Sequence, residues 1–231
     1  MARPEKPVDR TVPACAELAD FLRARRKSAG LGYREMSELV GGMPSKTTFE
    51  RAASGSGVPS WETVARYVEL TMTKEEDFTG YMGAVLRQAR RLWIKARRAT
   101  RAPYYLHKAP DPALIGSKAD FSRALRDLHI WAGCPTPGEM ESMSPAGALP
   151  KTTAYRIING RALPIDSYQL MAFLTACEVP TLEGMEPWLE AAARAFVGYP
   201  SHRNWVEMHI WIRDKIKTAE TVRASFLENA A

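Results

Sequence analysis

Apolar side chains in the first hundred residues recur three or four positions apart, the spacing of one face of an α-helix. Serine or threonine stands at several expected helix starts, and glycine at several expected ends. The pattern predicts five helices, over residues 16–28, 33–40, 45–54, 60–68 and 73–101. The last helix is expected to begin at a capping box formed by Thr73 and Glu76 and to carry Phe78 on its apolar face.

A second set of elements follows. Ala119-Asp120-Phe121 repeats Ala19-Asp20-Phe21 at an offset of 100 residues, and the offset reaches 105 further along the chain. We therefore expect extra residues around positions 132–149, in an elongated second-helix region. Helices are predicted from about residue 119, from a capping box at Thr136 and Glu139, and over 150–159, 165–177 and 181–197. A final helix over 201–228 has no counterpart in the first half.

The clearest internal repeat pairs residues 45–55 with residues 150–160. The segments read SKTTFERAASG and PKTTAYRIING, so Lys-Thr-Thr, an arginine and a terminal glycine keep their spacing. A proline follows four residues after each glycine, at Pro59 and Pro164. A repeat of this length indicates one structural unit used twice.

Charge distinguishes the two halves. The net charge is +6, with a pI of about 9.3. Residues 1–115 hold 20 basic and 13 acidic residues, whereas residues 116–231 hold 12 and 13. A polyanionic partner is therefore expected to be attracted chiefly to the first half.

The remaining composition argues against several functional classes. No apolar run reaches the length of a membrane span. The three cysteines are far apart, the four histidines lack Asp or Cys at ligand spacing, and the common catalytic motifs do not occur. We therefore expect no enzymatic activity, no cofactor and no metal, in a reduced cytoplasmic setting at the nucleoid.

A short helix, a tight turn of small residues and a second short helix form the helix-turn-helix plan. The second helix presents short polar side chains and cations that can meet base edges in the major groove. Candidate DNA-binding residues are Ser45, Lys46, Thr47, Thr48 and Arg51 in the first copy, and Lys151, Thr152, Thr153, Tyr155, Arg156 and Arg161 in the second. Tyr155 falls where the first copy has Glu50, and a core position is equally compatible with it.

The segment from Gly42 to Gly55, followed by Val58-Pro59-Ser60-Trp61, resembles the XRE (lambda-repressor/Cro-like) helix-turn-helix family in its actinobacterial style. Asn159-Gly160-Arg161-Ala162-Leu163-Pro164 matches the same pattern. The resemblance covers about 55 residues in each half. It implies an all-α fold of two tandem five-helix domains plus an extra C-terminal helix, and sequence-specific binding of double-stranded DNA. The chain departs from the family in having two heads, a longer second-helix region and a charge-poor second half.

The expected organisation is a flexible arm (1–13), a first helix-turn-helix domain with a long basic fifth helix (14–102), a connector with prolines (103–116), a second helix-turn-helix domain (117–199) and a C-terminal helix (200–231). Phosphate-backbone candidates are Arg34, Arg90, Arg91, Arg97 and Arg98. Glu139 and Glu141, on the helix before the second recognition helix, are expected to point away from DNA.

Two hypotheses of function remain open. In the first, the protein is a transcriptional regulator whose two linked heads read related half-sites. In the second, only the first unit binds DNA, while the second unit and the C-terminal helix bind a protein partner or a second copy of the chain. A plasmid or chromosome maintenance protein would share the features of the first.

Overall fold

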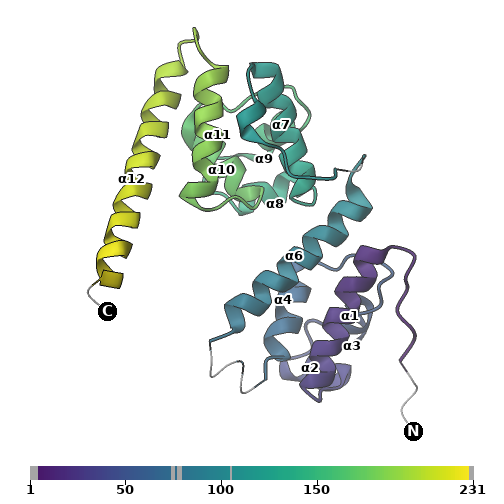
Figure 1. The fold of residues 1–231 in the computed structure, drawn as a ribbon. Helices are drawn as coiled ribbons and strands as arrows, with labels where there is room; N and C mark the ends of the chain where they lie inside the picture. Colours follow the sequence, from purple (N-terminus) through teal and green to yellow (C-terminus); the bar gives the residue numbers. More distant parts are fainter. Residues whose placement is uncertain (1–4, 74–75, 77–79, 105, 229–231) are drawn as a thin grey trace. The chain divides into compact units, whose positions relative to one another are not determined.

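The computed structural model describes residues 5–73, 76, 80–104 and 106–228, with side chains up to residue 223 (Figure 1). Every regular element in these residues is a helix, which confirms the all-α prediction. None of the helices described is long and apolar enough to cross a membrane. The chain divides into two compact units, Met1–Tyr105 (unit 1) and Leu106–Ala231 (unit 2).

Unit 1 is built from helices that bury one apolar face each. They are α1 (Pro13–Ser28), α2 (Tyr33–Leu39), α3 (Lys46–Ala52), α4 (Trp61–Leu70) and α6 (Met82–Arg101). The core gathers Leu18 and Leu22 of α1, Met36 of α2, Phe49 of α3 and Tyr67 of α4, all fully buried. The predicted caps are present, because Ser45 Oγ accepts from the Thr48 amide and Ser60 Oγ accepts from the Thr63 amide.

The predicted fifth helix is wrong in its extent. Thr73 and Glu76 form the expected reciprocal bonds, but α6 begins at Met82, after Gly80 at a φ of 68°. Phe78 lies outside the described residues. A left-handed glycine interrupts α-helical geometry, so the capping box and the basic helix α6 are separate features.

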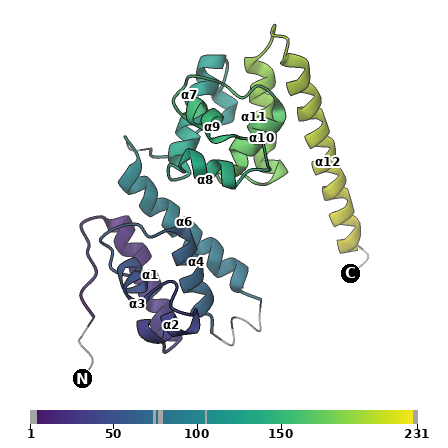
Figure 2. The same ribbon diagram turned by 180° about the vertical axis from the view of Figure 1, so that it is seen from behind.

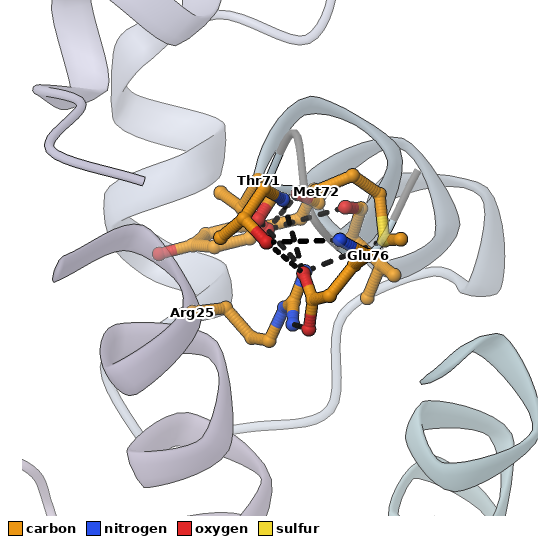
Figure 3. Close-up of polar contacts among 7 residues, drawn as sticks. Arg25, Thr71, Met72 and Glu76 are labelled. Atoms are coloured by element: carbon orange, nitrogen blue, oxygen red, sulfur yellow. Dashed lines mark hydrogen bonds and ion pairs between the residues drawn. The ribbon is translucent and has the colours of Figure 1, made fainter. Parts of the chain in front are cut away.

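Glu76 links the segment that follows α4 to α1 through Arg25 (Figure 3). The Arg25 guanidinium donates to both carboxylate oxygens of Glu76, at 2.9 Å to Oε2, and to the Thr71 carbonyl oxygen at 2.7 Å. This guanidinium, assisted by the Thr73 backbone amide, lowers the pKa of Glu76 from 4.5 to about 2. The ionised carboxylate therefore stabilises the folded state.

The flexible-arm prediction is wrong for residues 5–12. Glu5 accepts hydrogen bonds from Arg26 and Tyr33 of α1 and α2. The Asp9 amide donates to the Ser54 carbonyl oxygen at 2.8 Å, which places the arm against the end of α3. These bonds to fixed groups hold the segment on the surface of unit 1.

Unit 2 begins within the predicted connector. Its elements are the short 3-10 helix η1 (Pro112–Leu114), α7 (Lys118–Trp131), α8 (Pro137–Ser142), α9 (Lys151–Ile158), α10 (Ser167–Ala176), α11 (Leu182–Ala195) and α12 (His202–Glu228). Ile115 is buried in its core, and Arg194 of α11 donates to the Pro112 carbonyl oxygen at 2.9 Å. The end of the proline-containing segment is thus part of unit 2.

The C-terminal helix contributes to the core of unit 2. Both views show α12 running beside α11 (Figures 1 and 2). Trp205 and Ile212 are fully buried, and the Trp205 ring centroid lies 5.2 Å from that of Phe196. Met208 and Ile216 pack against the same core, so the apolar side chains of α12, at spacings of three or four residues, are used within unit 2 itself.

Buried positions in the first helices of the two units correspond at an offset of 103 residues. Leu18 and Phe121 correspond, as do Leu22 and Leu125, whereas Phe21 is partly exposed. Arg26 Nη1 contacts the Leu31 carbonyl oxygen at 3.0 Å, and His129 Nε2 contacts the Pro135 carbonyl oxygen at 2.8 Å. The Ala-Asp-Phe match at an offset of 100 is therefore fortuitous.

The extra residues expected between the first and third helices of unit 2 are present, because residues 132–150 separate α7 from α9 whereas residues 29–45 separate α1 from α3. Helix α8 has six residues, against seven in α2. The added residues lie in the turns that flank α8, where Gly133 and Cys134 both take positive φ. The insertion thus lengthens the turns, while α8 remains similar in length to α2.

The ion pair of Glu76 makes a testable contribution to stability. Replacing Glu76 by Gln should lower the free energy of unfolding at pH 7 by about 1–2 kcal/mol, after allowance for solvent screening. Since the folded-state pKa lies below 4.5, the contribution is complete above about pH 5 and is lost as pH falls toward 2. Urea titrations at several pH values should show the two proteins converging in acid, and a constant difference would contradict the assignment.

Candidate nucleic-acid interface

Helices α2 and α3 are joined by a compact turn. Gly41 and Gly42 both adopt positive φ, which ends α2 and reverses the chain before Ser45. Ser45 then caps α3, with its Oγ 3.2 Å from the Thr48 amide nitrogen and 3.0 Å from Thr48 Oγ1. This order of elements is that of a helix-turn-helix.

Helix α3 is held on unit 1 by its inward face. Phe49 and Ala52 are buried, and the Phe49 ring packs edge-on against Tyr67 at 5.7 Å between centroids. Since α3 has seven residues, this packing accounts for its stability better than intrinsic helix propensity does. The opposite face is left to solvent.

The five candidates of the first copy all lie on exposed positions of α3 or at its cap. They are Ser45, Lys46, Thr47, Thr48 and Arg51. Lys46 Nζ lies 3.6 Å from Glu50 Oε1 in an exposed pair of the kind that contributes little to stability. Arg51 is exposed and forms no ion pair with any residue described. Its charge is therefore accessible to a ligand.

The end of α3 is fixed by two hydrogen bonds and a close approach of the backbone at Gly55. Arg23 Nε donates to the Ala53 carbonyl oxygen at 2.7 Å, and the Asp9 backbone amide donates to the Ser54 carbonyl oxygen. Gly55 follows at a φ of 79°, and a Cβ atom there would stand 2.4 Å from the Asp9 carbonyl oxygen. The repeated glycine is therefore required in unit 1 by both backbone conformation and lack of space.

The basic helix α6 supports the loop after α3. Trp93 Nε1 donates to the Pro59 carbonyl oxygen at 2.8 Å. The Arg90 guanidinium lies over the rings of Trp61 and Trp93, at 4.7 and 4.5 Å from their centroids. These contacts give Arg90 a structural role in addition to any phosphate contact.

The phosphate-backbone candidates differ in exposure. Arg97 is 2% exposed and lies against Trp93, with its guanidinium carbon 4.4 Å from the ring centroid, so the prediction that it meets phosphate is wrong. Helical periodicity places it on the inner face, which a charge count does not reveal. Arg91 is exposed and Arg98 partly exposed. Arg34 is exposed and paired with Glu38 at 2.9 Å.

In unit 2, helix α9 presents the second set of candidates. Ala154 and Ile157 face the core, while Lys151, Thr152, Arg156 and Arg161 are exposed and Thr153 is partly exposed. Tyr155 is 48% exposed, so it does not take the core position that the sequence left open. Its ring lies 6.0 Å from the Arg161 guanidinium carbon.

The start of α9 differs from that of α3. Pro150 provides no side-chain cap, and the Lys151 amide donates instead to Glu141 Oε1 at 3.0 Å. Glu141 therefore points toward the start of α9, whereas Glu139 turns back to the Thr136 amide of its own capping box. A carboxylate at this position adds negative charge beside Lys151.

The corresponding position in unit 1 is Ser37. Glu35 and Glu139 each accept a hydrogen bond from the backbone amide three residues earlier, and Met36 and Met140, one residue later, are both fully buried. Ser37 thus stands where unit 2 has Glu141. Ile165 and Tyr168 of unit 2, which the sequence placed in the helix predicted over 165–177 without a binding role, are also exposed.

Comparison with known proteins identifies one segment. Residues 17–78, about a quarter of the chain and all within unit 1, match a family model described as a helix-turn-helix domain. The match spans α2, the turn and α3, whose geometry is described above. No curated protein and no solved structure matches the chain. Unit 1 therefore contains a helix-turn-helix domain.

Proposed function

We propose that the protein is a sequence-specific DNA-binding regulator in which α3 of unit 1 enters the major groove. The observation that carries this proposal is the exposed polar face of α3, on a helix whose other face is fixed by Phe49. Lys46 and Arg51 supply cations, and an arginine can bind guanine through two hydrogen bonds. The family match at residues 17–78 supports the same conclusion.

The proposal extends to an XRE-like protein with two tandem heads. In support, Glu35 and Glu139 each accept a hydrogen bond from the backbone amide three residues earlier, and a fully buried methionine follows each of them. Both also carry Lys-Thr-Thr on the first turn of the next helix. Two linked heads would read related half-sites, because binding of the first raises the local concentration of the second. Maintenance of a plasmid or chromosome would require the same DNA-binding activity.

A second candidate function rests on Glu141 and the exposed aromatic side chains of unit 2. A carboxylate beside Lys151 opposes the approach of a phosphate backbone. Tyr155 stands where unit 1 has Glu50, and Tyr168, the second residue of α10, stands where unit 1 has Glu62, the second residue of α4. Aromatic residues are enriched in protein interfaces. In this alternative, unit 2 and the exposed part of α12 bind a protein partner or a second copy of the chain.

The first test concerns the reader in unit 1. Arg51→Ala and Lys46→Ala, made separately, should each weaken specific binding by about 1–3 kcal/mol for a base contact. Binding is measured by fluorescence anisotropy on fragments selected from a genomic DNA library, with Arg203→Ala on α12 as the charge-matched control. Unchanged affinity in both α3 variants, with folding confirmed by circular dichroism, would remove α3 as the reader.

The second test concerns phosphate contacts by α6. Replacing Arg91 and Arg98 together by Ala should reduce the slope of log affinity against log salt by about 0.9 for each phosphate that the variant no longer neutralises. The control removes the same charge from α12, through Arg203→Ala with Arg213→Ala. A slope equal to that of the control would indicate that Arg91 and Arg98 face solvent and contact no phosphate.

The third test concerns unit 2 and includes one variant expected to lose DNA contacts and one expected to gain affinity. If α9 reads DNA, Lys151→Ala with Arg156→Ala should shrink a footprint to one half-site. Glu141→Ser, which introduces the residue of unit 1, should tighten binding and steepen its salt dependence, because it removes a negative charge beside Lys151.

The control for the expected gain in affinity is Glu220→Ser, which removes the same charge from an exposed position of α12. An unchanged footprint in the double variant, together with equal affinities for Glu141→Ser and Glu220→Ser, would favour the protein-interaction alternative for unit 2.

A further inference from the structure

Three potential metal ligands converge between α11 and α12, apart from the candidate DNA-binding helices α3 and α9. Glu186 and Glu190 are four residues apart, on one face of α11, and His209 comes from the neighbouring helix α12. One donor atom of each lies within 4.8 Å of the others. His209 Nε2 is 2.7 Å from Glu186 Oε1.

We propose that Glu186, Glu190 and His209 form a binding site for a divalent first-row transition metal, with Zn²⁺ as the favoured ion. Imidazole nitrogen together with carboxylate oxygen is a ligand set that zinc accepts. Calcium and magnesium prefer sites made of oxygen alone. The imidazole therefore selects the class of metal.

The spacing of the donors fits such an ion. Zinc–nitrogen and zinc–oxygen bonds of about 2.0–2.2 Å place neighbouring ligand atoms about 3–3.5 Å apart. Side-chain rotation is enough to bring atoms already within 4.8 Å to that separation, so neither helix has to move. Three protein ligands leave at least one position for water.

The surroundings allow an ion to enter and be held. The side chains of His209 and Glu186 are 13% and 25% exposed, and Glu190, at 50%, stands at the open side. Partial burial strengthens the attraction between a cation and the two carboxylates. The open side provides a path from solvent.

Two like charges on one helix face also favour a cation. Carboxylates at positions i and i+4 repel each other and destabilise a helix. His209 contacts Glu186, while Glu190 is compensated from α11 itself by Arg194, at 3.1 Å. Arg194 also donates to the Pro112 carbonyl oxygen, so it has a partner if a metal takes Glu190.

Occupancy of this site would be linked to the folding of unit 2. The ion would join α11 to α12, and α12 supplies Trp205 and Ile212 to the core. A ligand that binds the folded state but not the unfolded state raises apparent stability. Metal binding should therefore be visible as protection against thermal unfolding.

The experiment uses the full chain without an affinity tag, stripped with a chelator and then dialysed. Calorimetric titration with zinc chloride should show one site per chain, and zinc should raise the Tm. Cobalt(II) should give visible absorption bands of a protein-bound ion. Magnesium and calcium at the same concentration should leave the Tm unchanged.

Variants separate a metal site from a simple contact between helices. Glu190→Gln removes a ligand but leaves the His209–Glu186 contact intact. It should bind zinc about tenfold more weakly or worse, with a Tm close to wild type in the absence of metal. His209→Gln should lose the site as well, whereas His202→Gln and Glu220→Gln serve as controls. Absence of a single zinc site in wild type, or equal zinc binding by Glu190→Gln, would overturn the proposal.

Discussion

The packing of Phe49 against the core is the contact on which the candidate reading surface depends. Helix α3 has seven residues, and an isolated helix of that length is not stable in water. Burial of Phe49 and Ala52 fixes the rotation of α3 about its axis, so Lys46, Thr47 and Arg51 must face solvent. The position of the polar face is thus a consequence of the apolar one. Hydrogen bonds to the carbonyl oxygens of Ala53 and Ser54 then set where the helix ends.

Unit 2 keeps this anchoring but changes the surface that it supports. Ala154 and Ile157 hold α9 as Phe49 and Ala52 hold α3. The start of the helix is different, because a serine hydroxyl caps α3 and a carboxylate from the preceding helix bonds to the first amide of α9. Both satisfy an amide that would otherwise lack a partner. They differ in charge, which alters the affinity of the helix start for a polyanion.

The helices and their caps could be predicted because they depend on local chemistry. Ser45, Ser60, Thr136 and Thr181 each accept from the expected amide, since capping requires only a short polar side chain at the right distance along the chain. The exposed lysine, threonine and arginine positions of α3 and α9 followed from the same periodicity. What these side chains bind stays a prediction.

The errors share a different cause, which is contact between residues far apart in sequence. Arg97 was counted among surface cations, but the indole of Trp93 and the core of unit 1 cover it. Glu141 lies ten residues before Lys151, and the turn before α9 brings the Lys151 amide to it. His209 of α12 contacts Glu186 of another helix, α11, which the spacing of residues along the chain does not reveal. Local sequence patterns contain no information about contacts between residues that are far apart in the chain.

The same reasoning explains why charge totals are a poor guide to the two units. Unit 1 carries most of the positive charge, yet Arg25 and Arg97 are largely buried, and Lys95 is paired with Glu17. These cations hold helices together. A close counter-charge weakens the field of Arg25 and Lys95 at the surface, and burial against Trp93 keeps Arg97 from direct contact with a ligand. In unit 2 the exposed carboxylate of Glu141 stands beside the start of α9. Its location gives that one charge more influence on a nucleic acid at α9 than a charge of equal sign on α12 would have, since the interaction falls with distance and is screened by salt.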